Sequence, residues 1–243
     1  MVKVLTPKIE ALTAYANEIT GKSDTTLSDA VASLANGYGG ENETDYDDVV
    51  LPSEYQRVEY IESSGTQFIN LPYGFYPTDT VSMRTSIDTS MRDDKFMVCP
   101  SQWNNNNNRF GLCGLAGNTN FIFAYGNMGT SYSAYALPRV NDGNLHDFYY
   151  KDEIFHIVDL KRAGGAGGTA FGAETYPLRL FYGYNSNTKG KICYYIHKKA
   201  DGRKLALYAC YRKSDGVIGM YDIENDVFYT NDGTGDFVKG QDV

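Results

Sequence analysis

The spacing of apolar residues changes near position 50 of this sequence. Before that point, apolar side chains recur every three or four residues, the interval that gives a helix one apolar face. One stripe runs from Ile9 to Ile19 and a second from Leu27 to Tyr38. We therefore predict a small helical hairpin within residues 1–38. Helices of about three turns are marginal by themselves, so we expect another surface to cover both stripes.

A short acidic stretch follows the predicted helices. "GGENETDYDD" (39–48) holds five carboxylates and two glycines with little apolar content. That composition is typical of a solvated linker, because it offers little to bury. We place a domain boundary here, which gives a helical anchor or oligomerisation segment at 1–38, an acidic linker at 39–50 and a larger domain at 51–243.

From Leu51 onward, apolar residues alternate with polar ones or form short mixed runs. Roughly a dozen segments have the length and composition of strands, among them "TVSMRTSID", "GKICYYIHKK" and "LALYACYRK". Turn signals such as "NNNNN", "AGGAGG", "KSDG" and "NDGTG" separate them. No helical period and no fixed repeat lies between, so the pattern predicts an all-β sandwich.

Composition narrows the class of partner. Aromatic residues make up 14% of the chain, with 21 Tyr against 12 Phe, and Tyr suits half-buried strands. The net charge of −8 argues against nucleic acid as a partner, since phosphate binding needs a basic patch. No apolar run at the start has the length of a signal peptide or a membrane span, so we expect synthesis in a cytoplasm and no membrane span.

Two segments carry a resemblance to a known family. "LPSEYQRVEYIESSGTQFIN" (51–70) and "CYRKSDGVIGMYDIENDVFYTNDGTGDF" (210–237) resemble the opening and closing segments of laminin-G-like domains. These are concanavalin A-like jelly rolls that occur in proteins of bacteriophages and prophages. Residues 1–38 resemble the short helical leader of phage structural proteins.

The resemblance implies a fold, a location and partners. The fold would be mainly β, a two-sheet jelly-roll sandwich whose first and last strands lie side by side. The location would be the virion surface, after synthesis in the bacterial cytoplasm. The N-terminal helices would then bind other virion proteins or copies of this chain, and we expect a homo-oligomer, with a trimer favoured.

Catalytic patterns are weak in this sequence. Glycan cleavage needs two carboxylates roughly 5 to 10 Å apart, and the string E-x-D-x-x-E does not occur. The nearest run, Asp222, Glu224 and Asp226, lies where a hairpin must turn, so we interpret these as turn residues. His146, His156 and His197 lack the spacing of metal ligands, and we interpret them as surface or packed residues.

Two further patterns point away from chemistry. "GAGGTA" (165–170) fits a nucleotide-binding string, but no helical pattern follows it, so we interpret it as a loop. We therefore expect no enzyme and no cofactor. The four cysteines are widely spaced, which favours buried free thiols over disulfides or a metal site; they are Cys99, Cys113, Cys193 and Cys210.

Two segments have the chemistry of a glycan site. In "CPSQWNNNNNRFG", an aromatic face that stacks on sugar C–H groups stands beside amides that donate and accept hydrogen bonds. The candidates there are Trp103, Asn104, Asn105, Asn106, Asn107, Asn108 and Arg109. A Gly/Ser-rich segment adds Tyr125, Tyr132 and Tyr135. The alternatives are a polar turn beside a core Trp and ordinary strand tyrosines.

Calcium is the one metal ion that the sequence leaves open. Asp93 with Asp94, and Asp232 with Asp236, are candidate ligands. The alternative, which we favour, is that all four are solvated turn acids.

Three functions follow from these patterns. The first is a non-enzymatic adhesion module in a tail fibre, baseplate or similar part, which binds a host-surface or environmental glycan as a receptor. The second is a capsid decoration or head-fibre protein without a ligand. A glycan hydrolase comes third. In each case we expect residues 211–240 to hold the sheet together and the middle loops to carry any function.

Overall fold

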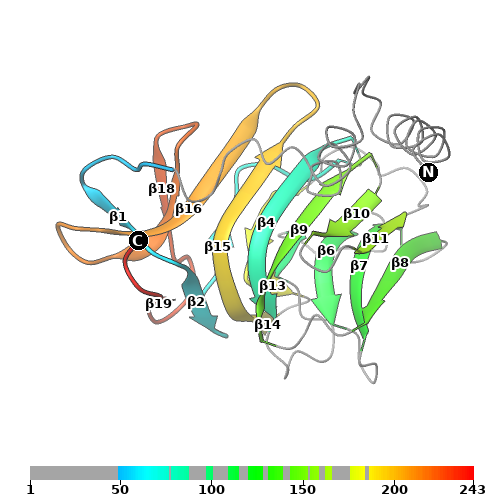
Figure 1. The fold of residues 1–243 in the computed structure, drawn as a ribbon, viewed down its shortest axis with the longest axis horizontal. Helices are drawn as coiled ribbons and strands as arrows, with labels where there is room; N and C mark the ends of the chain where they lie inside the picture. The colour runs from blue at the N-terminus through cyan, green and yellow to red at the C-terminus, as the bar shows by residue number, and fades with distance from the viewer. Residues whose placement is uncertain are drawn as a thin grey trace, which may run out of the picture. The chain divides into compact units, whose positions relative to one another are not determined.

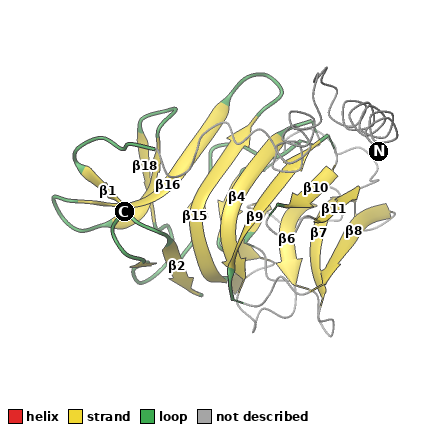
Figure 2. Ribbon diagram, in the orientation of Figure 1, coloured by secondary structure: helices red, strands yellow, loops and turns green. Residues whose placement is uncertain are grey.

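The described part of the chain is built of antiparallel β-strands. The computed structural model describes residues 49–76, 78–87, 97–100, 109–114, 120–127, 131–138, 143–152, 154–158, 162–165, 176–183 and 186–243. Every regular element in these residues is a strand, and none is a helix (Figures 1 and 2). The prediction of a mainly β protein is therefore confirmed there, whereas the helical hairpin and all but the end of the acidic linker lie outside the described residues.

One large sheet dominates (Figure 1). Eight of its strands form a continuous series of hydrogen-bonded neighbours, with β11 at one end and β18 at the other. They are β11 (Arg162–Gly165), β10 (Ile154–Ile157), β9 (Leu145–Lys151), β4 (Thr80–Ile87), β15 (Lys189–Lys198), β16 (Lys204–Arg212), β17 (Ile218–Asp222) and β18 (Val227–Thr230). Three short strands complete the sheet: β1 (Tyr55–Arg57) pairs with β16, and β2 (Ile61–Ser64) pairs with β15 and with β19 (Val238–Lys239).

Strands near the beginning and the end of the described residues pair with each other. Glu62 of β2 stands opposite Val238 of β19, and an isolated bridge joins Val58 to Asp242. Figure 1 shows β1, β2 and β19 gathered near the C-terminus. The expectation that the first and last strands lie side by side is confirmed.

Three smaller sheets accompany the large one. The first has the order β3 (Ile69–Asn70), β12 (Leu178–Leu180) and β5 (Val98–Pro100). The second pairs β13 (Tyr182–Gly183) with β14 (Ser186–Asn187), and the third has the order β6 (Arg109–Gly114), β7 (Asn120–Asn127) and β8 (Ser131–Pro138).

The hydrophobic core joins the large sheet to the sheet β3-β12-β5. Alternate residues of neighbouring strands enter it, because successive side chains of a strand point to opposite faces. The large sheet supplies Val81, Met83, Phe148, Tyr150, Tyr195, Leu205, Leu207 and Met220, and the small sheet supplies Ile69, Val98, Leu178 and Leu180. Each such side chain contributes about 1.5–3 kcal/mol when fully buried, so this layer contact stabilises the fold.

One glycine-rich segment corrects a prediction. "AGGAGG" (163–168) was predicted as a turn, yet Arg162–Gly165 form strand β11. Gly165 stands opposite Ile154, and Ala163 stands opposite His156. Strand β11 is at the end of the sheet order, and pairing with a regular neighbour outweighs the low strand propensity of Gly there.

Candidate functional site

An open cleft lies beside the turn that joins β16 to β17. Its volume is about 440 Å³, within the range of about 300–1,000 Å³ common for small-molecule sites. Residues 215–218, 230–231, 233 and 235–237 line it. The cleft therefore belongs to the C-terminal part of the chain.

The β16–β17 turn fixes the first wall of the cleft. Gly216 closes the turn with a left-handed φ of 71° and donates its N–H to the Arg212 carbonyl at 2.8 Å. The Arg212 guanidinium forks onto the Asp215 carboxylate, with Nη2–Oδ2 at 2.7 Å and Nε–Oδ1 at 3.1 Å. The hydrogen bonds from Arg212 hold the pKa of Asp215 below its ordinary value. This wall therefore presents an ion pair, in which the charge of Asp215 is balanced by Arg212.

The loop after β18 forms the opposite wall. The Asn231 side chain accepts the N–H of Gly233 at 2.7 Å and donates to the Gly235 carbonyl at 2.6 Å. A side chain at Gly233 would collide with the Thr66 carbonyl oxygen. The absence of a side chain at Gly233 lets its backbone approach the Thr66 carbonyl, and the Asn231 bonds hold the loop there. This wall of the cleft therefore consists largely of main chain.

Apolar side chains form the floor, and free polar groups stand on the rim. Phe237 is buried, while Val217 and Ile218 are half-buried. The carboxylate of Asp236 and the hydroxyl of Thr230 have no hydrogen-bond or ion-pair partner within the described residues. An apolar floor with oxygen acceptors around it suits a neutral ligand that carries both C–H faces and hydroxyl groups.

The candidates of the Trp–Asn segment fall mostly outside the described residues. Trp103, Asn104, Asn105, Asn106, Asn107 and Asn108 lie there, so their role stays a prediction. Arg109 is the first residue of β6.

The three candidate tyrosines are strand residues. Tyr125 lies in β7 opposite Ser133, whereas Tyr132 and Tyr135 lie in β8. Tyr132 shares a cross-strand row with Gly126 and Arg109. By alternation, the positions of Tyr125 and Tyr135 belong to one face of the sheet and those of Tyr132 and Arg109 to the other. A single site on one face would thus use only part of the set.

The three acids of the β17–β18 hairpin hold the turn. Asp222 ends β17, is fully buried and accepts the N–H groups of Ala206 and Glu224 at 3.0 and 3.1 Å. Glu224 pairs with Lys204 at 3.0 Å, and Asp226 has a left-handed φ of 58°. The interpretation as turn residues is confirmed for Glu224 and Asp226, while Asp222 is the last strand residue.

The calcium candidates give no cluster in the part of the chain that the structure describes. Asp232 accepts the N–H of Asn70 at 2.8 Å, and Asp236 lies in the same loop. No group of three or more His, Cys, Asp or Glu there could hold a metal ion. Asp93 and Asp94 lie outside the described residues.

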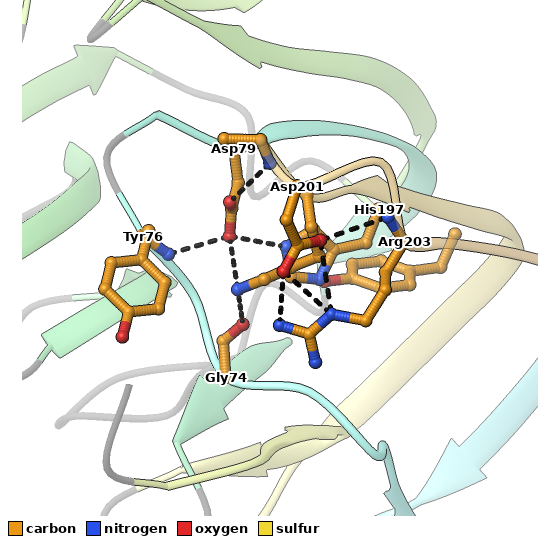
Figure 3. A network of polar contacts seen from close by, with 9 residues as sticks. Gly74, Tyr76, Asp79, His197, Asp201 and Arg203 are labelled. Atoms are coloured by element: carbon orange, nitrogen blue, oxygen red, sulfur yellow. Dashed lines mark hydrogen bonds and ion pairs between the residues drawn. The ribbon is translucent and has the colours of Figure 1, made fainter. Parts of the chain in front are cut away.

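A buried charge network lies at the end of β15 (Figure 3). Asp79 Oδ2 receives His197 Nε2 and Lys199 Nζ, both at 2.9 Å, and the N–H of Tyr76 at 2.8 Å. The ammonium of Lys199 also donates to the Gly74 carbonyl at 2.9 Å. The network therefore ties the segment 74–79 to the β15–β16 hairpin.

All three ionisable side chains of this network are buried, with exposed fractions of 1%, 0% and 3% for Asp79, His197 and Lys199. Burial raises the pKa of Asp79, but the bonds from His197, Tyr76 and Lys199 outweigh it, so the pKa lies below its ordinary value. The interpretation of His197 as a packed residue is confirmed. The carboxylate partner was missed, because Asp79 and His197 are 118 positions apart and no local pattern joins them.

The remaining predicted side chains are also packed. His146 is buried and His156 half-buried, as interpreted from the sequence.

Cys193 and Cys210 are buried free thiols, as predicted. Burial raises the pKa of both thiols to about 12, so neither is a nucleophile near neutral pH. The side chains of Cys99 and Cys113 lie outside what the structure describes.

Two comparisons complete the description. No protein-family model matches the sequence, and a search among curated proteins finds no match. Across the described residues, no helix has the length and apolar character needed to cross a membrane.

Proposed function

We propose that this chain is a surface protein of a bacteriophage particle whose β-sandwich binds a glycan without cleaving it. In this proposal the domain is a laminin-G-like jelly roll, and residues 1–38 join it to other virion proteins or to further copies of the chain in a trimer. Two observations support the fold: the core between two antiparallel sheets and the pairing of the first strands with the last.

The cleft of the C-terminal segment is the observation that carries the binding function. Its volume of about 440 Å³ suits one or two sugar rings. The half-buried side chains of Val217 and Ile218 offer apolar contacts to the C–H face of a sugar, and Asp236 and Thr230 offer acceptors to its hydroxyl groups. A site that opens to solvent binds weakly in a single copy, and several copies on one particle raise the avidity.

The purely structural alternative, a decoration or fibre protein without a ligand, rests on another observation. The buried network of Asp79 and the pairing of β2 with β19 both stabilise the fold. Under this alternative the cleft has no function. The two functions differ in one measurable property, which is glycan binding by the folded domain.

A glycan array with the whole chain tests the proposal, followed by titration calorimetry on the strongest hit. Asp236→Asn removes a charged acceptor and should weaken binding roughly tenfold, because hydrogen bonds to charged groups contribute about 1.5–3 kcal/mol. The matched control is Glu224→Gln, which removes one charge from a different hairpin and should leave binding unchanged. An array without hits, or equal effects of the two variants, would favour the structural alternative.

The virion assignment has its own test. Immunogold electron microscopy with antibody against residues 51–243 should label the tail tip or fibres of particles from the producing strain. Label over the capsid would favour decoration, and particles without label would contradict the assignment.

A further inference from the structure

Arg179, on the sheet β3-β12-β5, stacks on two neighbouring aromatic rings. Its neighbours Leu178 and Leu180 are fully buried in the core, so Arg179 belongs to the opposite face of β12. The guanidinium carbon lies 5.1 Å from the ring centre of Phe68 and 4.6 Å from that of Tyr182. The two rings stand 5.4 Å apart in an edge-to-face arrangement, so the cation is within reach of both rings.

A hydrogen bond fixes the remaining freedom of this side chain. Nε of Arg179 donates to Oδ1 of Asn70 at 2.7 Å, and the two residues stand opposite each other in β12 and β3. The backbone of Asn70 is held in turn by the Asp232 carboxylate. Arg179 is therefore held from three sides before any ligand arrives.

Within the described residues, the two Nη groups of Arg179 have no hydrogen-bond or ion-pair partner. Arg179 has five N–H donors in a planar fork, and the structure uses only the one on Nε. Arg203 and Arg212 differ: each also stacks on a ring, but each forks onto a carboxylate, Asp201 and Asp215 respectively. Among these three stacked arginines, Arg179 alone keeps both Nη groups without a partner in the described residues.

We infer that Arg179, Asn70, Phe68 and Tyr182 form a subsite for the carboxylate of an acidic sugar, such as a uronic acid. The planar guanidinium group donates two parallel hydrogen bonds to the oxygens of a carboxylate. The flanking rings contact the C–H face of the same sugar. The rings also shield the ion pair from water, which strengthens it.

The subsite adjoins the cleft. A Cβ added at Gly233 would lie 3.1 Å from the Phe68 ring, and the N–H of Phe68 donates to the Asn231 side chain at 3.1 Å. Gly233 and Asn231 both line the cleft. A glycan with one ring in the cleft can therefore place a neighbouring acidic ring against Arg179. The inference rests on the proposed glycan binding and names its substrate class.

The test uses the whole chain and two probes: an oligogalacturonide and the same oligosaccharide with its carboxyl groups reduced to alcohols. Wild type should bind the acidic form about tenfold more tightly than the reduced form. Arg179→Gln should remove that preference, so that this variant binds the acidic and the reduced form with similar affinity. Arg179→Lys, which keeps the charge but not the planar fork, should retain only part of the preference.

Arg203→Gln is the matched control. It removes a ring-stacked arginine whose fork is already occupied by Asp201, so the preference for the acidic probe should persist. Thermal unfolding of each variant verifies that it folds, and a third probe, tetraglutamate, tests a peptide as the source of the carboxylate.

The outcomes are distinct. Equal binding of both oligosaccharides by wild type, or an unchanged preference in Arg179→Gln, overturns this inference alone. Tighter binding of tetraglutamate than of the acidic oligosaccharide overturns the sugar assignment. Binding of neither oligosaccharide by wild type contradicts the inference together with the proposed glycan binding.

Discussion

The Asp79 network and the cleft use the same chemical groups in opposite ways. In the network, one buried carboxylate satisfies His197, Lys199 and a backbone N–H. In the cleft, the carboxylate of Asp236 faces solvent without a partner among the described residues, and on the adjoining surface Arg179 keeps two donors unused.

This difference separates groups that stabilise from groups available to bind. A buried ion needs every partner, because desolvation costs several kcal/mol per charge. A rim group keeps its water when unbound and exchanges it for a ligand at small cost. The expectation that residues 211–240 hold the sheet together agrees with the pairing of β17, β18 and β19. Residues around these strands also line the cleft.

The largest expected effect comes from Asp79→Asn. The substitution removes the carboxylate that pairs with the buried ammonium of Lys199, and removing one partner of a buried ion pair typically costs about 3–5 kcal/mol. Urea unfolding followed by tyrosine fluorescence and circular dichroism measures the loss. Asp201→Asn is the control, since this exposed carboxylate forks onto Arg203 and its removal should leave the unfolding free energy close to that of wild type. Equal losses in the two variants would show that the buried network does not stabilise the fold.

Gly233→Ala tests the other region. The added methyl group collides with the Thr66 carbonyl, so the loop must shift, at a cost of about 1–3 kcal/mol. Because the loop is a wall of the cleft, glycan affinity should fall at least about tenfold in calorimetry.

Gly202→Ala is its control. Gly202 has a left-handed φ of 92° with nothing within 4 Å of an added Cβ, so the cost is backbone strain alone, about 1–2 kcal/mol. This variant should keep the wild-type affinity. Unchanged affinity in Gly233→Ala would place the ligand elsewhere.

The pH dependence of stability gives a smaller signal from the network. The pKa of Asp79 is lower in the folded protein than its ordinary value of 3.8. A group with a depressed folded pKa contributes stability that is complete above the unfolded pKa and is lost as the pH falls through the folded pKa. The difference in unfolding free energy between wild type and Asp79→Asn should thus be constant near neutral pH and shrink below about pH 4. A difference that grows on acidification would contradict this account.

The strand pattern of the fold could be predicted because it is local. Alternation in "TVSMRTSID" and the apolar run of "LALYACYRK" gave β4 and β16, and "KSDG" gave the turn at Gly216. The glycine-rich β11 could not be predicted, because its strand conformation comes from pairing with β10.

The candidate site was less predictable than the fold. Its components are separated by long stretches of sequence: Arg179 and Asn70 are 109 positions apart, and Phe68 and Asn231 are 163 apart. The sequence showed "NDGTG" as a turn, and turn composition does not reveal whether its two sides enclose a cleft. Trp103 and the adjoining Asn residues could be proposed as a glycan site from the sequence, because these residues are neighbours in the chain.

The most direct test of glycan binding in the cleft is a titration of the ¹⁵N-labelled chain with the strongest array hit, followed by amide chemical shifts. The account predicts shifts that cluster at residues 215–218 and 230–237, with Phe68 and Asn70 joining them when the glycan is acidic. Shifts confined to the segment around Trp103, or to β7 and β8, would contradict the cleft as the binding site.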